Sequence, residues 1–417
     1  MLKFTENQSL FANAFDDTLV NNAFEVLKEE KSSDRVGYYN LPSTSLEIIE
    51  ALKVYEKSNE LLSTIKNIVV IGIGGSSLGA KAVDSMLKHK KQNGKKLFFF
   101  ENSDPVNIVN TLNCLDKENS LFIVISKSGG TIETISTFKT ILHHFDIDLQ
   151  SDDAKRLIAI TDNGSILSQF ASEFNIKEFN LPLNVGGRFS VLSSVGIIPL
   201  YLAGYDVETL LNGAKEFEQS FFNTESKEIL EKACFIYKNR EQYRTNVLFA
   251  YSNSLEDFSK WFVQLWGESL GKIDKDNNKV GLTPIGLTGA VDQHSFLQLI
   301  IEGPEDKTVT FINVEDFENE LSIPDMSLKH LEKTDFINGK SFNELINAQC
   351  DATMQSIEDT NLPADKITIS RLDESNCGAL IMYYEILTSL VGAMLNVNTY
   401  NQPGVELGKV ILDKKFK

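Results

Sequence analysis

Short apolar, β-branched runs alternate with longer segments of helical periodicity along the first half of the chain. These runs lie at residues 67–73, 96–102, 121–126 and 156–161. A turn rich in glycine, proline or small polar residues follows each run and leads into a segment with apolar residues at helical spacing. Such alternation predicts βαβ units, in which the strands form a parallel sheet and the helices cover its faces.

The same pattern restarts in the second half, after long helical stretches that begin near residue 206. Apolar runs lie at residues 246–251, 308–314 and 366–370, and a long apolar helical segment follows the last of them. We therefore expect an α/β protein with two similar domains, each a parallel sheet flanked by helices. The expected units are residues 1–205 (N-terminal helices and the first domain), 206–398 (the second domain) and 399–417 (a C-terminal arm).

The composition is that of an ordinary soluble globular protein, with 42% apolar and 24% charged residues. A formal net charge of −18 disfavours nucleic acid and anionic membrane surfaces as partners, because both require a basic face. A small anionic ligand needs only local positive charge, so the acidic balance does not exclude one.

The cysteines and the termini indicate a cytoplasmic protein. The four cysteines lie far apart, without a C-x-x-C pair, and are typical of free thiols in a reducing compartment. The N-terminal sequence carries acidic residues early and lacks the apolar core of a signal peptide. The apolar run at residues 195–205 is shorter than the ~20 residues that a membrane-spanning helix needs.

Three polar turns are expected at one edge of the first sheet. They read GIGGSSLG, SKSGGT and NVGGRFS, and each opens a helical segment. In open parallel sheets ligands bind beyond the carboxyl ends of the strands, where helix N-termini offer free N–H groups. Ser126, Ser128 and Thr131 add hydroxyl donors and Lys127 adds positive charge, so the turns suit a phosphate monoester. Each turn alone could merely cap a helix; three at one edge favour a ligand.

The sequence gives little support for other phosphate-binding motifs or for a metal site. In the first turn Ser77 stands where the last glycine of G-x-G-x-x-G belongs, and the P-loop pattern is absent. The histidines, cysteines and carboxylates of the chain lack the spacing of metal ligands. We therefore expect neither a metal nor a cofactor.

A helical segment in the second half carries a candidate general base. Ser254 and Asp257 predict a capping box at its start. Trp261, Leu265 and Glu268 then fall on one helix face, so a carboxylate continues an apolar stripe. Partial desolvation favours proton uptake by such a carboxylate, which suits a general base.

Simpler interpretations of these residues remain open from the pattern alone. Glu268 and Lys272 stand at i, i+4 and could form an exposed ion pair. His294, between a strand-like run and an apolar helix, could be structural. The terminal NQPGVELGK could be a plain helix start, with Pro403 in its turn and Lys409 exposed.

Together these stretches resemble the phosphoglucose isomerase (glucose-6-phosphate isomerase) family, and in particular its shorter bacterial branch. The resemblance covers about residues 35–417 and rests on IGGSSLG, SKSGGTIET, GGRFSVLSSVG, QLWGESLGK, DQHSF and NQPGVELGK in the family's order. It implies two sugar-isomerase-type domains, each a parallel sheet flanked by helices, in a homodimer.

The resemblance also implies a role for each matched residue. Glu268 corresponds to the base that moves a proton between C1 and C2, and Arg188 to the cation beside the enediolate oxygen. His294 and Lys409 correspond to the pair that assists ring opening, with His294 reaching across the dimer interface. The implied substrate contacts are Ser126, Lys127, Ser128 and Thr131 in the phosphate loop, together with Gly75, Ser76, Gly187, Gln264 and Gln402.

The implied activity is the reversible interconversion of glucose 6-phosphate and fructose 6-phosphate, a step of glycolysis and gluconeogenesis, without a cofactor. Two alternatives remain: an isomerase that also accepts mannose 6-phosphate, and a sugar-phosphate-binding regulator of the same fold without catalysis. Many longer relatives have a bulkier phosphate loop and an aromatic residue after the last glutamine. Here Gly129, Gly130 and Pro403 stand instead, which leaves sugar selectivity open.

Overall fold

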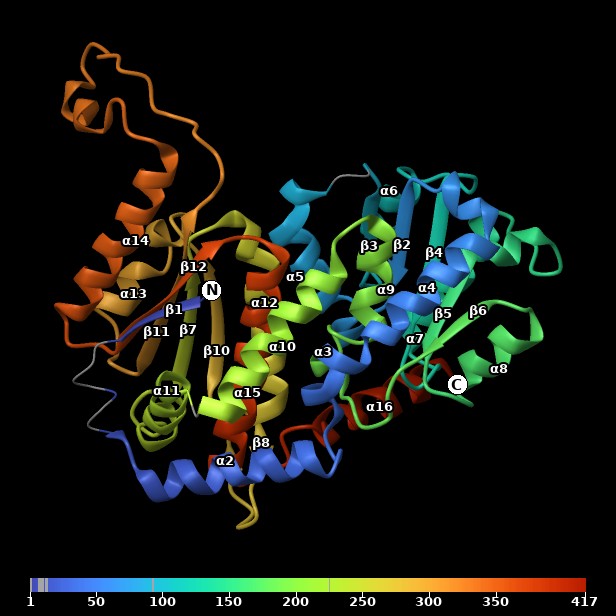
Figure 1. The fold of residues 1–417 in the computed structure, drawn as a ribbon, viewed down its shortest axis with the longest axis horizontal. Helices are drawn as coiled ribbons and strands as arrows, with labels where there is room; N and C mark the ends of the chain where they lie inside the picture. The colour runs from blue at the N-terminus through green and yellow to red at the C-terminus, as the bar shows by residue number, and fades with distance from the viewer. Residues whose placement is uncertain (1, 7–10, 12–13, 92–93, 225) are drawn as a thin grey trace.

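A computed structural model describes residues 2–6, 11, 14–91, 94–224 and 226–417, and it contains two five-stranded sheets side by side (Figure 1). The first sheet is built from β2 (Asn67–Ile71), β3 (Lys96–Phe100), β4 (Ser120–Ile125), β5 (Leu157–Thr161) and β6 (Lys177–Asn180). Its order is β3-β2-β4-β5-β6 and all its pairs are parallel. After β2 the chain adds β3 on one side of it and β4 on the other, so the strand order reverses between β2 and β4. Ligands usually bind at such a point.

The second sheet repeats this arrangement. It contains β1 (Leu2–Glu6), β7 (Thr245–Ala250), β10 (Thr283–Thr288), β11 (Lys307–Asp316) and β12 (Ala364–Arg371), in the order β1-β12-β11-β7-β10. Only β1 runs antiparallel in it. The α/β class with two helix-flanked, largely parallel sheets is therefore confirmed. The predicted unit 1–205 includes β1, yet this strand pairs with β12 of the second sheet; the division into units otherwise stays a prediction.

Helices from both halves fill the space between the sheets (Figure 1). α5 (Leu78–Leu87), which follows the first polar turn, packs against α12 (Glu256–Leu270), which lies on β10 of the second sheet. This contact brings the carboxyl edge of the first sheet to the helix that carries Glu268. The predicted site is thus built from both halves of the chain.

α15 (Glu374–Met394) is the central helix of the second half. It packs against α2 (Asp17–Ser32), α10 (Val207–Thr224), α11 (Lys227–Lys238) and α12. By length and hydropathy α15 would fit a membrane span, unlike the shorter apolar run at residues 195–205, but 89% of its apolar window is buried inside the protein. Burial against these helices accounts for its composition.

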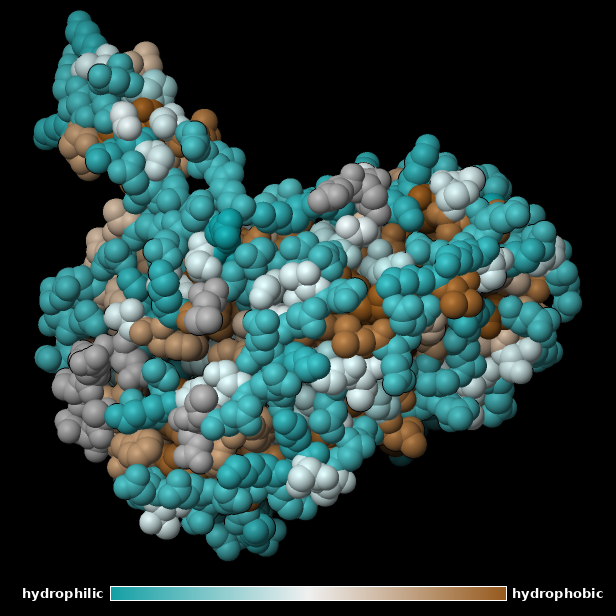
Figure 2. All heavy atoms as spheres, viewed as in Figure 1, coloured by the Kyte–Doolittle hydropathy of each residue, from teal (hydrophilic) through white to brown (hydrophobic). Residues whose placement is uncertain are grey.

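The structure also describes further helices and a small hairpin. They are α3 (Leu41–Thr44), α4 (Leu46–Ser58), α6 (Pro105–Leu112), α7 (Ile132–His144), α8 (Ile166–Glu173), α9 (Ser194–Ala203), α13 (Leu297–Ile301), α14 (Phe342–Glu358), α16 (Glu406–Phe416) and the hairpin of β8 (Lys272–Ile273) and β9 (Lys279–Val280). The segment between β11 and α14 projects from the body (Figures 1 and 2). The face drawn in Figure 2 is mainly hydrophilic, in keeping with the high charge.

The start of α12 differs from the prediction. The expected capping box of Ser254 and Asp257 does not form, because the Ser252 side chain accepts the N–H of Ser254 and starts a short 3-10 turn first. α12 then begins at Glu256 without a side-chain cap. Asp257 instead pairs with Lys260, at 3.0 Å.

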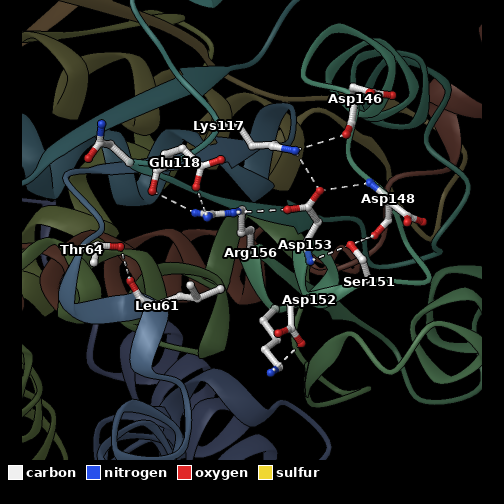
Figure 3. Close-up of polar contacts among 12 residues, drawn as sticks. Leu61, Thr64, Lys117, Glu118, Asp146, Asp148, Ser151, Asp152, Asp153 and Arg156 are labelled. Atoms are coloured by element: carbon white, nitrogen blue, oxygen red, sulfur yellow. Dashed lines mark hydrogen bonds and ion pairs between the residues drawn. The ribbon is translucent and has the colours of Figure 1, made fainter.

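Charged residues lie at the amino-terminal ends of the strands of the first sheet (Figure 3). Arg156, just before β5, is buried and donates to the Glu118 backbone carbonyl at 2.9 Å and to its carboxylate at 2.6 Å. Lys117, ahead of β4, donates to Asp153 at 2.9 Å. These ion pairs occupy the end of the sheet opposite to the polar turns, so the carboxyl edge is the one left for a ligand.

Candidate active site

The first and third polar turns meet at the carboxyl edge of the first sheet. β2 leads into the 3-10 turn Gly74–Ser76, and a second 3-10 turn spans Gly187–Phe189. A Cβ on Gly75 would lie 2.3 Å from the carbonyl carbon of Gly187, so only glycine permits this approach. Gly74 has a φ of 61°, which also favours glycine. The expected convergence of Gly75, Ser76 and Gly187 is therefore found.

The second polar turn lies beside the first, because β4 pairs with β2. A Cβ on Gly72 would lie 3.2 Å from the carbonyl oxygen of Ile125, the last residue of β4. Within the turn the hydroxyls of Ser126 and Thr131 lie 3.0 Å apart, while Ser128 is exposed. Thr131 directly precedes α7, so the turn presents hydroxyls and a helix N-terminus at the switch point.

Lys127 links the second turn to the third. Its ammonium donates to the carbonyls of Leu183, at 3.0 Å, and Val185, at 2.8 Å. These carbonyls belong to the chain that leads into Gly187. Lys127 therefore helps to fix the position of the third turn, and its predicted contact with phosphate stays a prediction.

Arg188 is the centre of the polar contacts at this edge. Its guanidinium donates to Ser269 Oγ (2.7 Å), Gln402 Oε1 (2.8 Å), the carbonyls of Thr399 and Asn401 (3.1 Å for Asn401), and it lies 3.4 Å from Glu268 Oε2. Burial lowers the pKa of Arg188, whereas the carboxylate of Glu268 raises it. An arginine remains charged even so, and here it is held rigidly by several acceptors.

Glu268 lies where the apolar stripe of α12 meets the edge of the site. Trp261 and Leu265 are 1% and 0% exposed, and the side chain of Glu268 is 31% exposed. One carboxylate oxygen faces Arg188 and the other accepts from Gln264 Nε2 at 3.4 Å. Lys272 donates to Asn401 instead of pairing with Glu268, so the expected alternative of an exposed Glu268–Lys272 pair is wrong.

Gln264 and Gln402 contact Glu268 and Arg188, respectively. The Nε2 of Gln264 would lie 3.0 Å from a Cβ on Gly74, which places this amide against the first turn. Gln402 follows α15 in sequence and reaches Arg188 from the C-terminal arm. A carboxylate, a fixed cation and two amides thus surround the point where three polar turns converge.

His294 and Lys409 lie apart from this cluster in the described part of the chain. His294 ends the 3-10 turn Val291–His294 after β10 and is exposed. Lys409 lies on α16, none of whose residues is buried, and its ammonium pairs with Glu406 at 2.7 Å. Neither side chain has a hydrogen bond or ion pair with Glu268, and their predicted catalytic roles stay predictions.

Sequence patterns singled out Gln402 but missed the contacts by which its segment positions Arg188. Residues 399–402, which we call the strap, supply two carbonyls and an amide to its guanidinium. Tyr400 of the strap donates to the carboxylate of Glu30 at 2.6 Å, and Tyr39 donates to the same oxygen at 3.0 Å. Burial raises the pKa of Glu30. The N-terminal helix α2 therefore reaches the site through the strap.

The described residues contain no group of three His, Cys, Asp or Glu side chains placed to hold a metal ion. That turnover needs no metal ion stays a prediction. The donors that do converge at the site are hydroxyls, amides and the Arg188 cation.

Comparison of sequences relates the chain to known proteins. Residues 43–416 match the family described as phosphoglucose isomerase. The chain is 44% identical over 406 residues to a glucose-6-phosphate isomerase of Campylobacter jejuni, which covers 97% of this chain and 98% of the relative. The two chains therefore share almost their whole length.

Comparison of structures agrees with the sequence relationship. A crystal structure of a hypothetical protein from Thermus thermophilus superposes with a TM-score of 0.90 at 30% identity and covers 100% of both chains. A glucose-6-phosphate isomerase from Chlamydia trachomatis superposes with a TM-score of 0.77 at 27% identity, over 88% of this chain and 72% of that one.

Proposed function

Since the chain belongs to the phosphoglucose isomerase family, we propose that the cluster around Arg188 and Glu268 is the active site at which it works. The chain is an aldose–ketose isomerase that interconverts glucose 6-phosphate and fructose 6-phosphate. The observation that carries the assignment of the site is the contact between a buried arginine and a partly exposed carboxylate, where three polar turns meet.

The reaction needs a base that moves one proton between neighbouring carbons. In the open-chain aldose, Glu268 removes the proton at C2 and the electrons form an enediolate. The same carboxyl returns a proton to C1, and the hydroxyl proton passes from O2 to O1, which gives the ketose. A positioned base of this kind contributes about 10²–10⁴-fold to the rate.

Arg188 stabilises the charge that develops in this reaction. The negative charge of the enediolate collects on the C1 and C2 oxygens, and a cation fixed beside them lowers the barrier without reorganising. The Ser269 hydroxyl and the strap hold the guanidinium in place before the substrate arrives. Glu268 and Arg188 together supply the base and the cation that proton transfer requires. Their presence favours catalysis over a purely regulatory role.

The phosphate group of the substrate is proposed to bind at Ser126–Thr131. This turn combines hydroxyls, small residues that let a ligand approach the backbone, and the N-terminus of α7, which favours an anion. Gly129 has a φ of 74°, a conformation that glycine adopts without strain.

Removal of the turn's hydroxyls should weaken phosphate binding. Ser128→Ala and Thr131→Ala each delete one hydrogen bond to a charged group, worth about 1.5–3 kcal/mol. Calorimetric titration with a non-reacting sugar acid phosphate measures the loss, and Ser136→Ala, an exposed serine on α7, is the control. Part of the lost binding energy is used in the transition state, so kcat falls as well. Unchanged affinity in both variants would place the phosphate elsewhere.

We further propose a cytoplasmic homodimer in which His294 and Lys409 complete the site for ring opening, with His294 supplied by the partner subunit. Both side chains are exposed in the single chain. α16 also leaves Leu407, Val410 and Ile411 exposed by 68%, 50% and 47%, and such apolar surface is typical of a protein interface.

A coupled assay tests the proposed function directly. The purified protein should convert fructose 6-phosphate to glucose 6-phosphate, detected by a dehydrogenase specific for the product. Mannose 6-phosphate in a parallel assay shows whether the site also accepts the C2 epimer. Binding of fructose 6-phosphate without turnover would instead indicate a sugar-phosphate sensor.

A further inference from the structure

Lys272 holds the strap from the side opposite to α2. It is the first residue of the β8–β9 hairpin, two residues beyond the end of α12. Its ammonium donates to both the carbonyl and the side-chain oxygen of Asn401, the latter at 3.2 Å. Arg188 donates to the same Asn401 carbonyl at 3.1 Å. Two cations therefore converge on one strap residue.

The contact with Asn401 connects Lys272 to the proposed base. Asn401 precedes Gln402, whose amide oxygen accepts from Arg188 Nη1 at 2.8 Å. The same nitrogen lies 3.4 Å from the carboxylate of Glu268. A shift of Asn401 would displace Gln402 and remove an acceptor from Arg188 at once.

Polar contacts rather than packing hold this part of the strap. Asn401 and Gln402 are exposed, and α16, which follows them, has no buried residue. Tyr400, the residue before Asn401, is anchored by its hydrogen bond to Glu30. Lys272 and Arg188 therefore fix the strap between Tyr400 and the exposed helix.

We propose, on the basis of the proposed isomerase function, that Lys272 is a positioning residue: its hold on Asn401 keeps Arg188 and Gln402 aligned with Glu268. Arg188 is used most fully when the enediolate charge develops, so misalignment raises the barrier more than it weakens substrate binding. Displacement of a catalytic group by about 1 Å can cost roughly 10²-fold in rate.

The surroundings of Lys272 make its hold dependent on pH. Burial and the positive charge of Arg188 lower the pKa of Lys272 to about 8, against the opposing effect of Glu268. The strap presents the uncharged Asn401 to Lys272, and β9 pairs Val280 with it. The ammonium is mostly protonated at neutral pH and loses its proton as the pH rises through about 8. The hold on Asn401 weakens over that range.

Three variants test the proposal in the full-length protein. Lys272→Met should lower kcat by about 10–100-fold with a smaller change in KM. Lys272→Arg retains a cation at every working pH and should restore most of the activity. Lys279→Met, which removes an exposed lysine from the other strand of the same hairpin, is the matched control and should behave as the wild type.

The pH profile supplies a readout that a purely structural role would not move. Wild-type kcat should fall as the pH rises through about 8, and Lys272→Arg should shift or abolish that fall. A Lys272→Met enzyme with wild-type kcat, or an alkaline fall that is the same in wild type and Lys272→Arg, would overturn the proposal. The wild-type assay is independent of these variants: an inactive wild type would refute the isomerase function itself. If Lys272→Met fails to fold, the comparison of wild type with Lys272→Arg still decides.

Discussion

Replacement of Glu268 by glutamine should abolish isomerisation while sugar-phosphate binding survives. The amide keeps the shape of the side chain, and its oxygen can still face Arg188, which lies 3.4 Å from the carboxylate. It has no basicity, so it cannot take the proton from C2. We expect kcat to fall by about 10²–10⁴-fold or more, because the amide cannot act as a general base.

Two measurements separate catalysis from binding in this variant. The coupled assay gives kcat, and calorimetric titration with a non-reacting sugar acid phosphate gives the affinity. Glu256→Gln, at the exposed first turn of the same helix, is the control and should leave both unchanged. Turnover near the wild-type rate would remove Glu268 from the mechanism. Lost affinity would show that the carboxylate acts in binding instead.

Activity should return when Glu268→Gln and His294→Ala protomers exchange subunits. Each variant alone is expected to be nearly inactive as a pure dimer. If His294 acts across the interface, one site of a mixed dimer contains both substitutions. The other site has an intact glutamate and an intact histidine. Random exchange makes half of the dimers mixed, so about a quarter of wild-type activity should reappear.

The exchange itself needs an independent check. A differently tagged pair of protomers, separated on both tags, shows how many mixed dimers form. Mixed dimers without any regain of turnover would mean that each His294 serves its own chain, because every site would then keep one lesion. Such a result would leave the role of Glu268 untouched.

The parts of the site that were predictable from sequence lie where local pattern determines placement. Gly75, Gly187 and the turn after β4 all follow the first sheet's strands, and parallel strands bring their carboxyl ends to one edge. Glu268 was predictable because Trp261 and Leu265 set the buried face of its helix at i, i+4 and i+7 spacing. In both cases the placement of the residues follows from a short stretch of the sequence.

The contacts that orient Arg188 were not predictable in this way. Two of its partners are the backbone carbonyls of Thr399 and Asn401, more than 200 residues away, and carbonyls have no residue type to recognise. The link from Glu30 to Tyr400 likewise joins α2 to the distant strap through tertiary packing. Lys272 stands inside a matched motif, but at i, i+4 from Glu268 it resembled an ordinary helix ion pair.

Fold features that depend on pairing partners were also missed. β1 is a short edge strand whose partner, β12, lies near the other end of the chain. The expected capping box at Ser254 does not form because the Ser252 hydroxyl accepts the backbone N–H of Ser254, which Asp257 would have accepted in the box. A 3-10 turn starts there instead.

Exchange of the C1 proton of fructose 6-phosphate with solvent deuterium tests the central claim, that Glu268 is the base, most directly. Proton NMR in deuterated buffer follows this exchange, which requires proton abstraction from C1. The wild-type protein should replace the proton with deuterium at a rate comparable to turnover. Glu268→Gln should show no exchange above a protein-free control, although it binds the sugar phosphate. Exchange by Glu268→Gln at the wild-type rate would contradict the account, because another group would then remove the proton.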